Sequence, residues 1–322
     1  VVLGDISLQV SASIGLTVYP LDGSEVDLLL RHADQAMYVA KQAGKNRYHL
    51  FDVAQDTAVK TQHESLEHIR GALARQEFVL YYQPKVNMRT GAVIGAEALI
   101  RWQHPERGLL APVAFLPIIE NDPLSVAVGE WVIAAALQQM LQWKAQGLEV
   151  AVSVNIGARQ LQQDDFAQRL TQLLARYPGV APQLLELEIL ETSALEDMAQ
   201  VFQAIQACQA LGVRFALDDF GTGYSSLTHL RHLPAEVIKI DQSFVRDMLE
   251  DADDLAIVTS VIGLAAAFRR EVIAEGVETT AHGLQLLALG CVMAQGYGIA
   301  RPMPAADLPS WVASWRPDVA WT

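Results

Sequence analysis

Long apolar segments, cysteine pairs and low-complexity tracts are all missing from this 322-residue chain. Its longest uncharged apolar runs, around residues 131–137 and 261–268, are far shorter than the roughly 20 residues that a membrane-spanning helix needs. We therefore expect no membrane contact from this chain. Its two cysteines, Cys208 and Cys291, lie in separate apolar stretches, which predicts buried free thiols and a reducing, cytoplasmic compartment. A longer protein containing the chain could still be anchored through other regions.

Basic residues are also scarce. The chain has 23 Lys and Arg against 37 Asp and Glu, a formal charge of −14. This charge repels phosphate backbones, so we expect no nucleic acid duplex as a partner. An acidic protein can still bind an anionic ligand when bound cations lie between the two. With 51% hydrophobic residues, the chain has enough apolar surface to offset the entropy cost of folding.

The length suits one large domain and a smaller unit. Residues 25–43 carry apolar side chains at helical spacing and end at Gly44, and a strand-like segment follows at residues 48–51. Residues 52–64 are polar with few apolar anchors. We predict an N-terminal unit at residues 1–52, a helical connector at 53–65 and the main domain at 66–322.

From residue 66 onward, short apolar runs alternate with stretches of helical periodicity. The runs are residues 78–82, 93–100, 150–154, 184–190, 213–217, 237–240, 272–274 and 291–294. Eight strands with intervening helices predict an α/β fold, a (β/α)8 TIM-like barrel. Only a turn-like segment at residues 87–91 separates the first two runs, so we expect these two strands to pair antiparallel.

Polar or charged residues that could form a site lie in or directly after the second to eighth runs. They are Glu97, Asn155, Glu188, Glu191, Asp218, Asp219, Lys239, Asp241, Glu275 and Gln295. The carboxyl ends of barrel strands converge on one face, where barrel enzymes place their active sites. Carboxylates crowded there would repel one another unless cations were bound, and hard divalent ions prefer oxygen ligands. The pattern therefore predicts magnesium or manganese.

Each of these residues also has an ordinary structural explanation. A single acid after a strand is more often a helix cap or a turn residue than a ligand. Lys239 is harder to explain in this way, because a lysine within an apolar run is rarely buried without a partner or a task. The joint pattern across the strands favours a functional site.

Several blocks occur in an order that resembles the EAL family of cyclic di-GMP phosphodiesterases, over residues 66–312. The blocks are Tyr82-Gln83-Pro84, Glu97-Ala98-Leu99 with Arg101-Trp102, Ser153-Val154-Asn155-Ile156, residues 186–191, residues 218–226, Ile238-Lys239-Ile240-Asp241, Ala274-Glu275-Gly276-Val277-Glu278 and Gln295-Gly296-Tyr297. The resemblance implies hydrolysis of cyclic di-GMP to linear 5′-pGpG with two Mg²⁺ or Mn²⁺ ions.

The resemblance also implies roles for single residues. The metal ligands would be Glu97, Asn155, Glu188, Asp218, Asp219 and Glu275, with Asp218 shared between the two ions. The catalytic residues would be Glu97, Lys239 beside the attacking water, and Glu275 as general base or water-orienting ligand. The residues that bind substrate would be Gln83, Leu99, Arg101, Asp241, Tyr297 and Pro302, with Arg101 gripping a phosphate.

Further implied roles concern the surroundings of the site. Glu191 would tether the loop that begins at Asp219, while Glu278 and Gln295 would support the site. Leu190 departs from the family's usual threonine, so a hydroxyl is missing beside Glu191. The family also dimerises through the barrel face next to this loop, which carries Phe220 and Tyr224, so we expect a homodimer.

The first residues resemble a different family. Ala33-Asp34-Gln35-Ala36-Met37-Tyr38 and Gly44-Lys45-Asn46-Arg47-Tyr48 are similar to the C-terminal end of a GGDEF diguanylate cyclase domain. The signature that names that domain is absent from this chain, so residues 1–52 cannot synthesise the messenger.

Two other functions remain as alternatives. A receptor that binds cyclic di-GMP without cleaving it belongs to the same family, but such members usually lack the metal ligands or the equivalents of Lys239 and Glu275, which are all present here. A barrel enzyme that uses Lys239 as a Schiff base would need a neutral lysine, which surrounding carboxylates disfavour.

Overall fold

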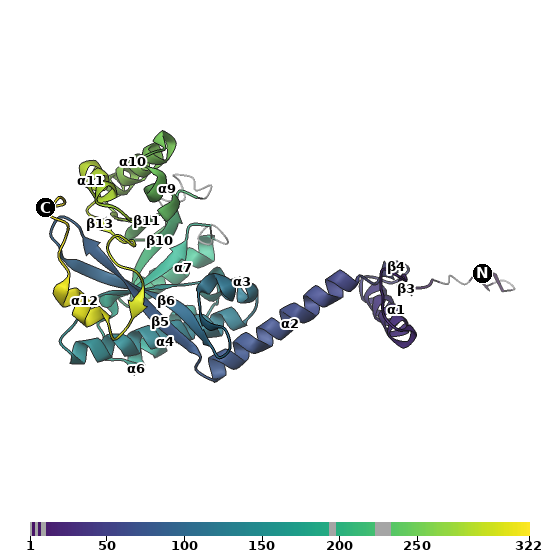
Figure 1. Ribbon diagram of the computed structural model, residues 1–322. Coiled ribbons are helices and arrows are strands. Elements are labelled where there is room, and N and C mark those ends of the chain that lie inside the picture. Colours follow the sequence, from purple (N-terminus) through teal and green to yellow (C-terminus); the bar gives the residue numbers. More distant parts are fainter. Residues whose placement is uncertain (1, 4–5, 8–10, 193–197, 223–232) are drawn as a thin grey trace. The chain divides into compact units, whose positions relative to one another are not determined.

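The computed structural model describes residues 2–3, 6–7, 11–192, 198–222 and 233–322 (Figure 1). Contacts within the chain divide it into two units, residues 1–69 and 70–322. The predicted connector lies within one helix, α2 (Val53–Ala74), which continues beyond residue 65. The domain limits drawn from the sequence stay a prediction.

The N-terminal unit is a small α/β element. Strand β1 (Val2–Leu3) pairs antiparallel with β2 (Ile6–Ser7), and β3 (Ile14–Leu16) pairs parallel with β4 (Tyr48–Leu50). Helix α1 (Val26–Gln42) packs against β3 and β4, as the helical spacing predicts. Gly44, at φ +108°, allows the turn that ends this helix. Large apolar side chains remain exposed on this unit, among them Leu21 at 79% and Tyr48 at 70%.

The second unit is built on a closed barrel of eight strands. They are β5 (Phe78–Asn87), β6 (Val93–His104), β8 (Val152–Asn155), β9 (Leu185–Leu190), β10 (Arg214–Phe220), β11 (Val237–Ile240), β12 (Glu271–Ala274) and β13 (Met293–Ala294). Strand β5 runs antiparallel to both neighbours, β6 and β13, and the other pairs are parallel. The TIM-like fold and its antiparallel first pair are therefore confirmed. Short strands β7 (Gly108–Leu110) and β14 (Met303–Pro304) pair with β6 and β5.

Helices cover the outside of the barrel (Figure 1). They are α3 (Leu116–Ile119), α4 (Leu124–Ala145), α5 (Ala158–Leu161), α6 (Phe166–Arg176), α7 (Met198–Gln209), α9 (Gln242–Asp247), α10 (Ala252–Ala267), α11 (Thr280–Leu289) and α12 (Leu308–Ser314), with 3₁₀ turns at Pro112–Ala114 and Pro182–Leu184. Amphipathic α6 buries Phe166 and Leu170. Cys208 and Cys291 are buried free thiols, as predicted.

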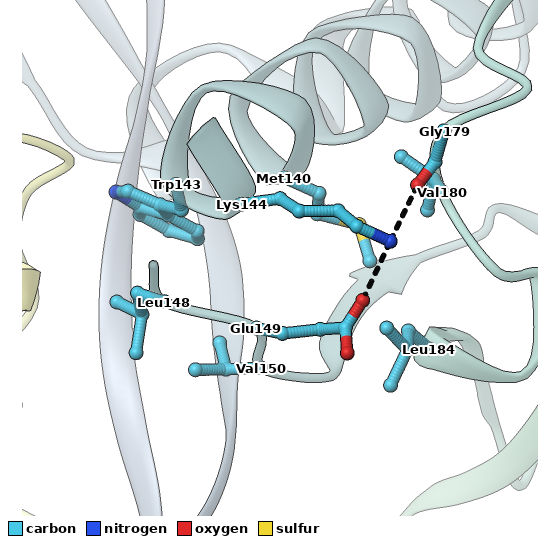
Figure 2. A pocket seen from close by; sticks show the side chains of 9 residues that line it. All are labelled: Met140, Trp143, Lys144, Leu148, Glu149, Val150, Gly179, Val180 and Leu184. Carbon is cyan, nitrogen blue, oxygen red and sulfur yellow. Dashed lines mark hydrogen bonds and ion pairs between the residues drawn. The ribbon is translucent and has the colours of Figure 1, made fainter. Parts of the chain in front are cut away.

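Helix α4 is long and apolar enough to cross a membrane by length and composition alone. It contacts β8 and β5, and residues such as Val132, Leu137 and Met140 are buried in the core. It therefore serves as a core helix of the barrel. Figure 2 shows its last turn beside a small apolar pocket, where Lys144 donates to the carbonyl oxygen of Gly179 at 3.1 Å and pairs with Glu149 at 2.9 Å. The residues that line this pocket precede β8 and β9, so it lies away from the carboxyl ends of the strands.

Candidate active site

The barrel interior brings together acids from widely separated parts of the sequence. Glu97 lies within β6, Glu188 within β9 and Asp218 within β10, and each is at most 6% exposed. Glu275 directly follows β12. The strands belong to one closed barrel, so side chains that point into its interior can meet even though residues 97 and 275 are 178 positions apart in the sequence. The sequence correctly predicted that these side chains converge.

Lys239 lies at the centre of this cluster and is completely buried. Its Nζ is 2.7 Å from Oε2 of Glu188, 2.9 Å from Oδ1 of Asp218 and 2.7 Å from Oε1 of Glu275. Glu97 is further away, with Oε2 at 3.7 Å. Burial alone would lower the pKa of Lys239, but the acids outweigh burial and hold that pKa well above its ordinary value. These contacts favour the charged form of Lys239, whereas Schiff-base chemistry needs the neutral amine.

The carboxylates form two groups of the size that a metal ion requires. Glu97, Glu188 and Asp218 can each offer an oxygen within 4.8 Å of the others, and so can Asp218, Asp219 and Glu275. Asp218 belongs to both groups. The amide of Asn155 adjoins the first group, since its Nδ2 donates to Oε1 of Glu97 at 2.8 Å. This is the arrangement that the resemblance implies for the ligands of two ions.

The electrostatics of the cluster fit bound cations. Burial and the neighbouring acids raise the pKa values of Glu188, Asp218 and Glu275 despite the nearby lysine. Burial, followed by repulsion from Asp218, raises the pKa of Asp219 to about 7. The lysines near this set therefore do not offset all of its negative charge. Oxygen donors with excess negative charge are the ligands that Mg²⁺ and Mn²⁺ prefer, so the donor set fits those ions.

The backbone after β10 turns sharply at the acid pair. Asp219 adopts φ +52°, a left-handed conformation that Asp and Asn tolerate better than most residues. Glu191 is buried, and its Oε2 accepts a hydrogen bond from the Gly221 amide at 2.8 Å. Glu191 therefore contacts the segment it was predicted to tether. The side chain of Leu190, the departure from the family, is 39% exposed.

The apolar residues expected at a dimer interface are not both on the surface. Phe220 is only 7% exposed within the chain, so it offers little apolar surface to a partner. Tyr224 and the rest of the block up to Ser226 lie outside the described residues.

The residues expected to bind substrate lie around the rim with different surroundings. Arg101 is half-buried, donates from Nη1 to its neighbouring carbonyl at Ile100 and lies 5.7 Å from the Tyr81 ring centre. Tyr297 is 53% exposed, with the Arg301 guanidinium 4.4 Å from its ring centre. Leu99 and Pro302 are half-buried.

Other expected site residues are engaged by the protein itself. Asp241 caps α9, where its Oδ1 accepts from the Ser243 amide at 2.9 Å, and its carboxyl group also forms a side-chain hydrogen bond with Asp219. Gln83 is buried and donates to the Ala300 carbonyl at 3.0 Å. Gln295 donates from Nε2 to Oε1 of Gln83 at 2.9 Å and to Oε2 of Glu97 at 2.7 Å, which joins it to the acid cluster.

Glu278 stands apart from the cluster. It is exposed, and within the described part of the chain its carboxylate belongs to neither candidate ligand group. Three buried residues that the sequence did not single out, Lys85, Ser153 and Glu186, lie next to the site instead. The sequence carries no signal for Lys85, which follows Gln83-Pro84 outside the apolar run at residues 78–82.

Comparison with known proteins agrees with this geometry. The EAL domain model matches residues 66–302. This chain belongs to the EAL domain family. The model of the diguanylate cyclase GGDEF domain matches residues 1–47.

Individual relatives extend over nearly the whole chain. The bifunctional diguanylate cyclase/cyclic di-GMP phosphodiesterase MucR of Pseudomonas aeruginosa is 40% identical over 95% of this chain and 45% of its own length. The cyclic di-GMP phosphodiesterase PdeR of Escherichia coli is 37% identical over 96% of this chain and 46% of its own length. The chain thus spans less than half the length of these relatives.

Solved EAL structures share the fold. The PaMucR phosphodiesterase in complex with c-di-GMP superposes with a TM-score of 0.73 at 41% identity, over 76% of this chain and 99% of that one. The FimX EAL domain from Pseudomonas aeruginosa, solved with c-di-GMP bound, has a TM-score of 0.68 at 24% identity, which supports the EAL fold alone.

Proposed function

We propose that the EAL domain of this chain hydrolyses cyclic di-GMP to linear 5′-pGpG with two Mg²⁺ or Mn²⁺ ions. The observation that carries the proposal is the pair of carboxylate groups that share Asp218 around the buried Lys239. The relatives support the choice of substrate, since PdeR is a cyclic di-GMP phosphodiesterase and the PaMucR structure is a c-di-GMP complex.

Different side chains would serve different steps of an in-line hydrolysis. The oxygen of a water forms a bond to phosphorus, one P–O3′ bond breaks, and the proton that the water loses balances the one that the O3′ leaving group gains. Glu275 accepts or orients the proton of the attacking water. Lys239 and Arg101 supply positive charge, with Arg101 suited to bidentate contact with the phosphate. When bound, the two cations would acidify a water and offset the charge that develops on the phosphodiester.

Binding without cleavage is the function to distinguish from this one. A receptor needs the rim residues but not an intact ligand set, whereas this chain keeps both carboxylate groups, Lys239 and Glu275. Incubation of the chain with cyclic di-GMP and Mg²⁺, followed by chromatographic separation of nucleotides, tests the proposal. Conversion to pGpG that stops with a chelator supports it. Saturable binding without any product over hours would make the chain a receptor.

The homodimer stays a prediction from the family resemblance. Sedimentation at high micromolar concentration tests it, and a single monomeric species would contradict it.

A further inference from the structure

A second buried lysine, Lys85 on β5, lies beside the acid cluster. It is 3% exposed, and its Nζ is 2.8 Å from Oε1 of Glu186 and 3.3 Å from Oε1 of Glu188. It also donates to Ser153, whose hydroxyl donates to Oε1 of Glu186 at 2.7 Å. Lys85, Ser153, Glu186 and Glu188 are all buried. Their polar groups cannot bond to water there, so they depend on these contacts with one another.

The strand register explains this placement. Gln83 faces Glu97 across β5 and β6, and Lys85 faces Gly95 two positions further along. In the same way, Asn155 is level with Glu188, and Ser153 with Glu186. Alternate residues of a strand point to the same face. Lys85, Ser153 and Glu186 therefore form the layer of the barrel interior directly beneath the candidate metal ligands.

Gly95 leaves this layer open for the lysine. A Cβ at Gly95 would lie 3.5 Å from Cε of Lys85 and 3.0 Å from the carbonyl oxygen of Ala151. The glycine thus contributes no side chain where the lysine stem passes. The long side chain can then extend across the interior to β8 and β9.

The carboxylate of Glu188 contacts a different lysine through each of its oxygens. Oε2 is 2.7 Å from Lys239, on the side of Glu97, Asp218 and Glu275, whereas Oε1 is 3.3 Å from Lys85. Glu188 is 1% exposed, so water cannot take the place of either contact. Contacts at both oxygens fix the plane of this carboxylate, and they leave Oε2 on the side of Lys239 while Lys85 contacts Oε1.

We propose that Lys85 is a positioning residue that fixes the carboxylate of Glu188 for metal binding. This inference rests on the proposed function of the same site. Residues that orient a metal ligand commonly affect metal affinity by about 10–100-fold. The competing explanation is that Lys85 only neutralises Glu186, which is its nearer partner at 2.8 Å.

Double variants separate the two explanations. Lys85→Gln with Glu186→Gln removes the lysine together with the acid that it would neutralise, and the pair stays polar. Lys85→Met with Glu186→Leu does the same with apolar side chains, since replacing a whole buried ion pair by apolar residues is often neutral for stability. Glu186→Gln alone is the matched control, because it leaves Lys85 beside Glu188.

Mn²⁺ affinity of the chelator-treated chain, measured by titration calorimetry, is the readout. Circular dichroism checks folding, and either folded double variant decides the question. We expect Glu186→Gln to bind Mn²⁺ within about threefold of the parent and the double variants to bind about tenfold or more weakly. Double variants that match the control would overturn the proposal.

The readout is independent of turnover. A parent chain without hydrolysis, combined with weakened Mn²⁺ binding in the double variants, would refute the proposed function and leave the role of Lys85 intact. Normal hydrolysis by the parent with unchanged Mn²⁺ binding in the double variants would support the proposed function and refute the role of Lys85.

Discussion

Lys239 Nζ lies 2.7 Å from Oε1 of Glu275. The two residues are separated by a helix-containing segment in sequence, but Lys239 lies in β11 and Glu275 directly follows its neighbour β12. The same ammonium group contacts Glu188 and Asp218. Lys239 therefore supplies positive charge at the point where several buried acids meet. This charge matters most when no cation is bound there.

Replacing Lys239 with methionine should destabilise the metal-free chain more than the metal-bound chain. Removing one partner of a buried ion pair costs about 3–5 kcal/mol, because the remaining charges are left without compensation. Bound cations would supply much of the lost charge. Thermal unfolding of parent and variant, with chelator and with saturating Mg²⁺, measures both differences.

The matched control is Lys144→Met. Lys144 pairs with Glu149, but both side chains are about half exposed, at 50% and 54%. Such surface pairs contribute about 0–1 kcal/mol. A Lys239→Met deficit that stays the same with and without Mg²⁺ would contradict the electrostatic role.

Metal binding should release protons at mildly acidic pH. Burial and repulsion from Asp218 raise the pKa of Asp219 to about 7 in the metal-free chain. A metal needs the ionised carboxylate, so affinity should rise as pH rises through about 7. Titration calorimetry in buffers of different ionisation enthalpy should detect more proton release at pH 6 than at pH 8.

The raised pKa of Asp219 also determines how the stability of the metal-free chain changes with pH. Because the folded metal-free chain holds this proton more tightly than the unfolded chain, its free energy of unfolding should fall as pH rises from about 4 to about 7. Asp219→Asn, which tolerates the left-handed backbone, should reduce both the proton release and this pH dependence. Proton release that is unchanged in the variant would show that another group titrates.

Arg101→Ala should weaken substrate binding more than turnover. A hydrogen bond to a charged group contributes about 1.5–3 kcal/mol, which corresponds to a roughly 10–100-fold higher KM. Steady-state kinetics separate KM from kcat, and the exposed Arg176→Ala on α6 controls for loss of surface charge. A kcat loss with unchanged KM would assign Arg101 to the chemical step instead.

The sequence predicted the barrel because each strand is a short apolar run that ends in turn or helix signals. It predicted the acid cluster for the same reason, since the carboxyl ends of parallel strands share one face. Glu97 is an exception to that rule, because β6 continues to His104 and carries the residue in its interior.

The remaining features depend on contacts between distant segments. Asp241 caps α9 through a local contact, but its hydrogen bond with Asp219 follows only from the pairing of β10 with β11. Lys85 was overlooked because its partners, Ser153 and Glu186, come from other strands and only the register brings them together. The burial of Phe220 likewise depends on packing that no local pattern encodes.

Hydrolysis by a Glu97→Gln variant tests the central claim most directly. Glu97 is buried among the candidate ligands, and glutamine keeps its shape while removing its charge. Glu149→Gln, on the surface near α4, is the matched control. Cyclic di-GMP loss and pGpG formation in Mg²⁺ are followed by chromatography.

We expect the parent and Glu149→Gln to form pGpG at similar rates. Glu97→Gln should be slower by at least about 100-fold, a loss of about 2.7 kcal/mol in the barrier, with cyclic di-GMP affinity changed much less. Turnover by Glu97→Gln within about tenfold of the parent would contradict hydrolysis at this carboxylate cluster.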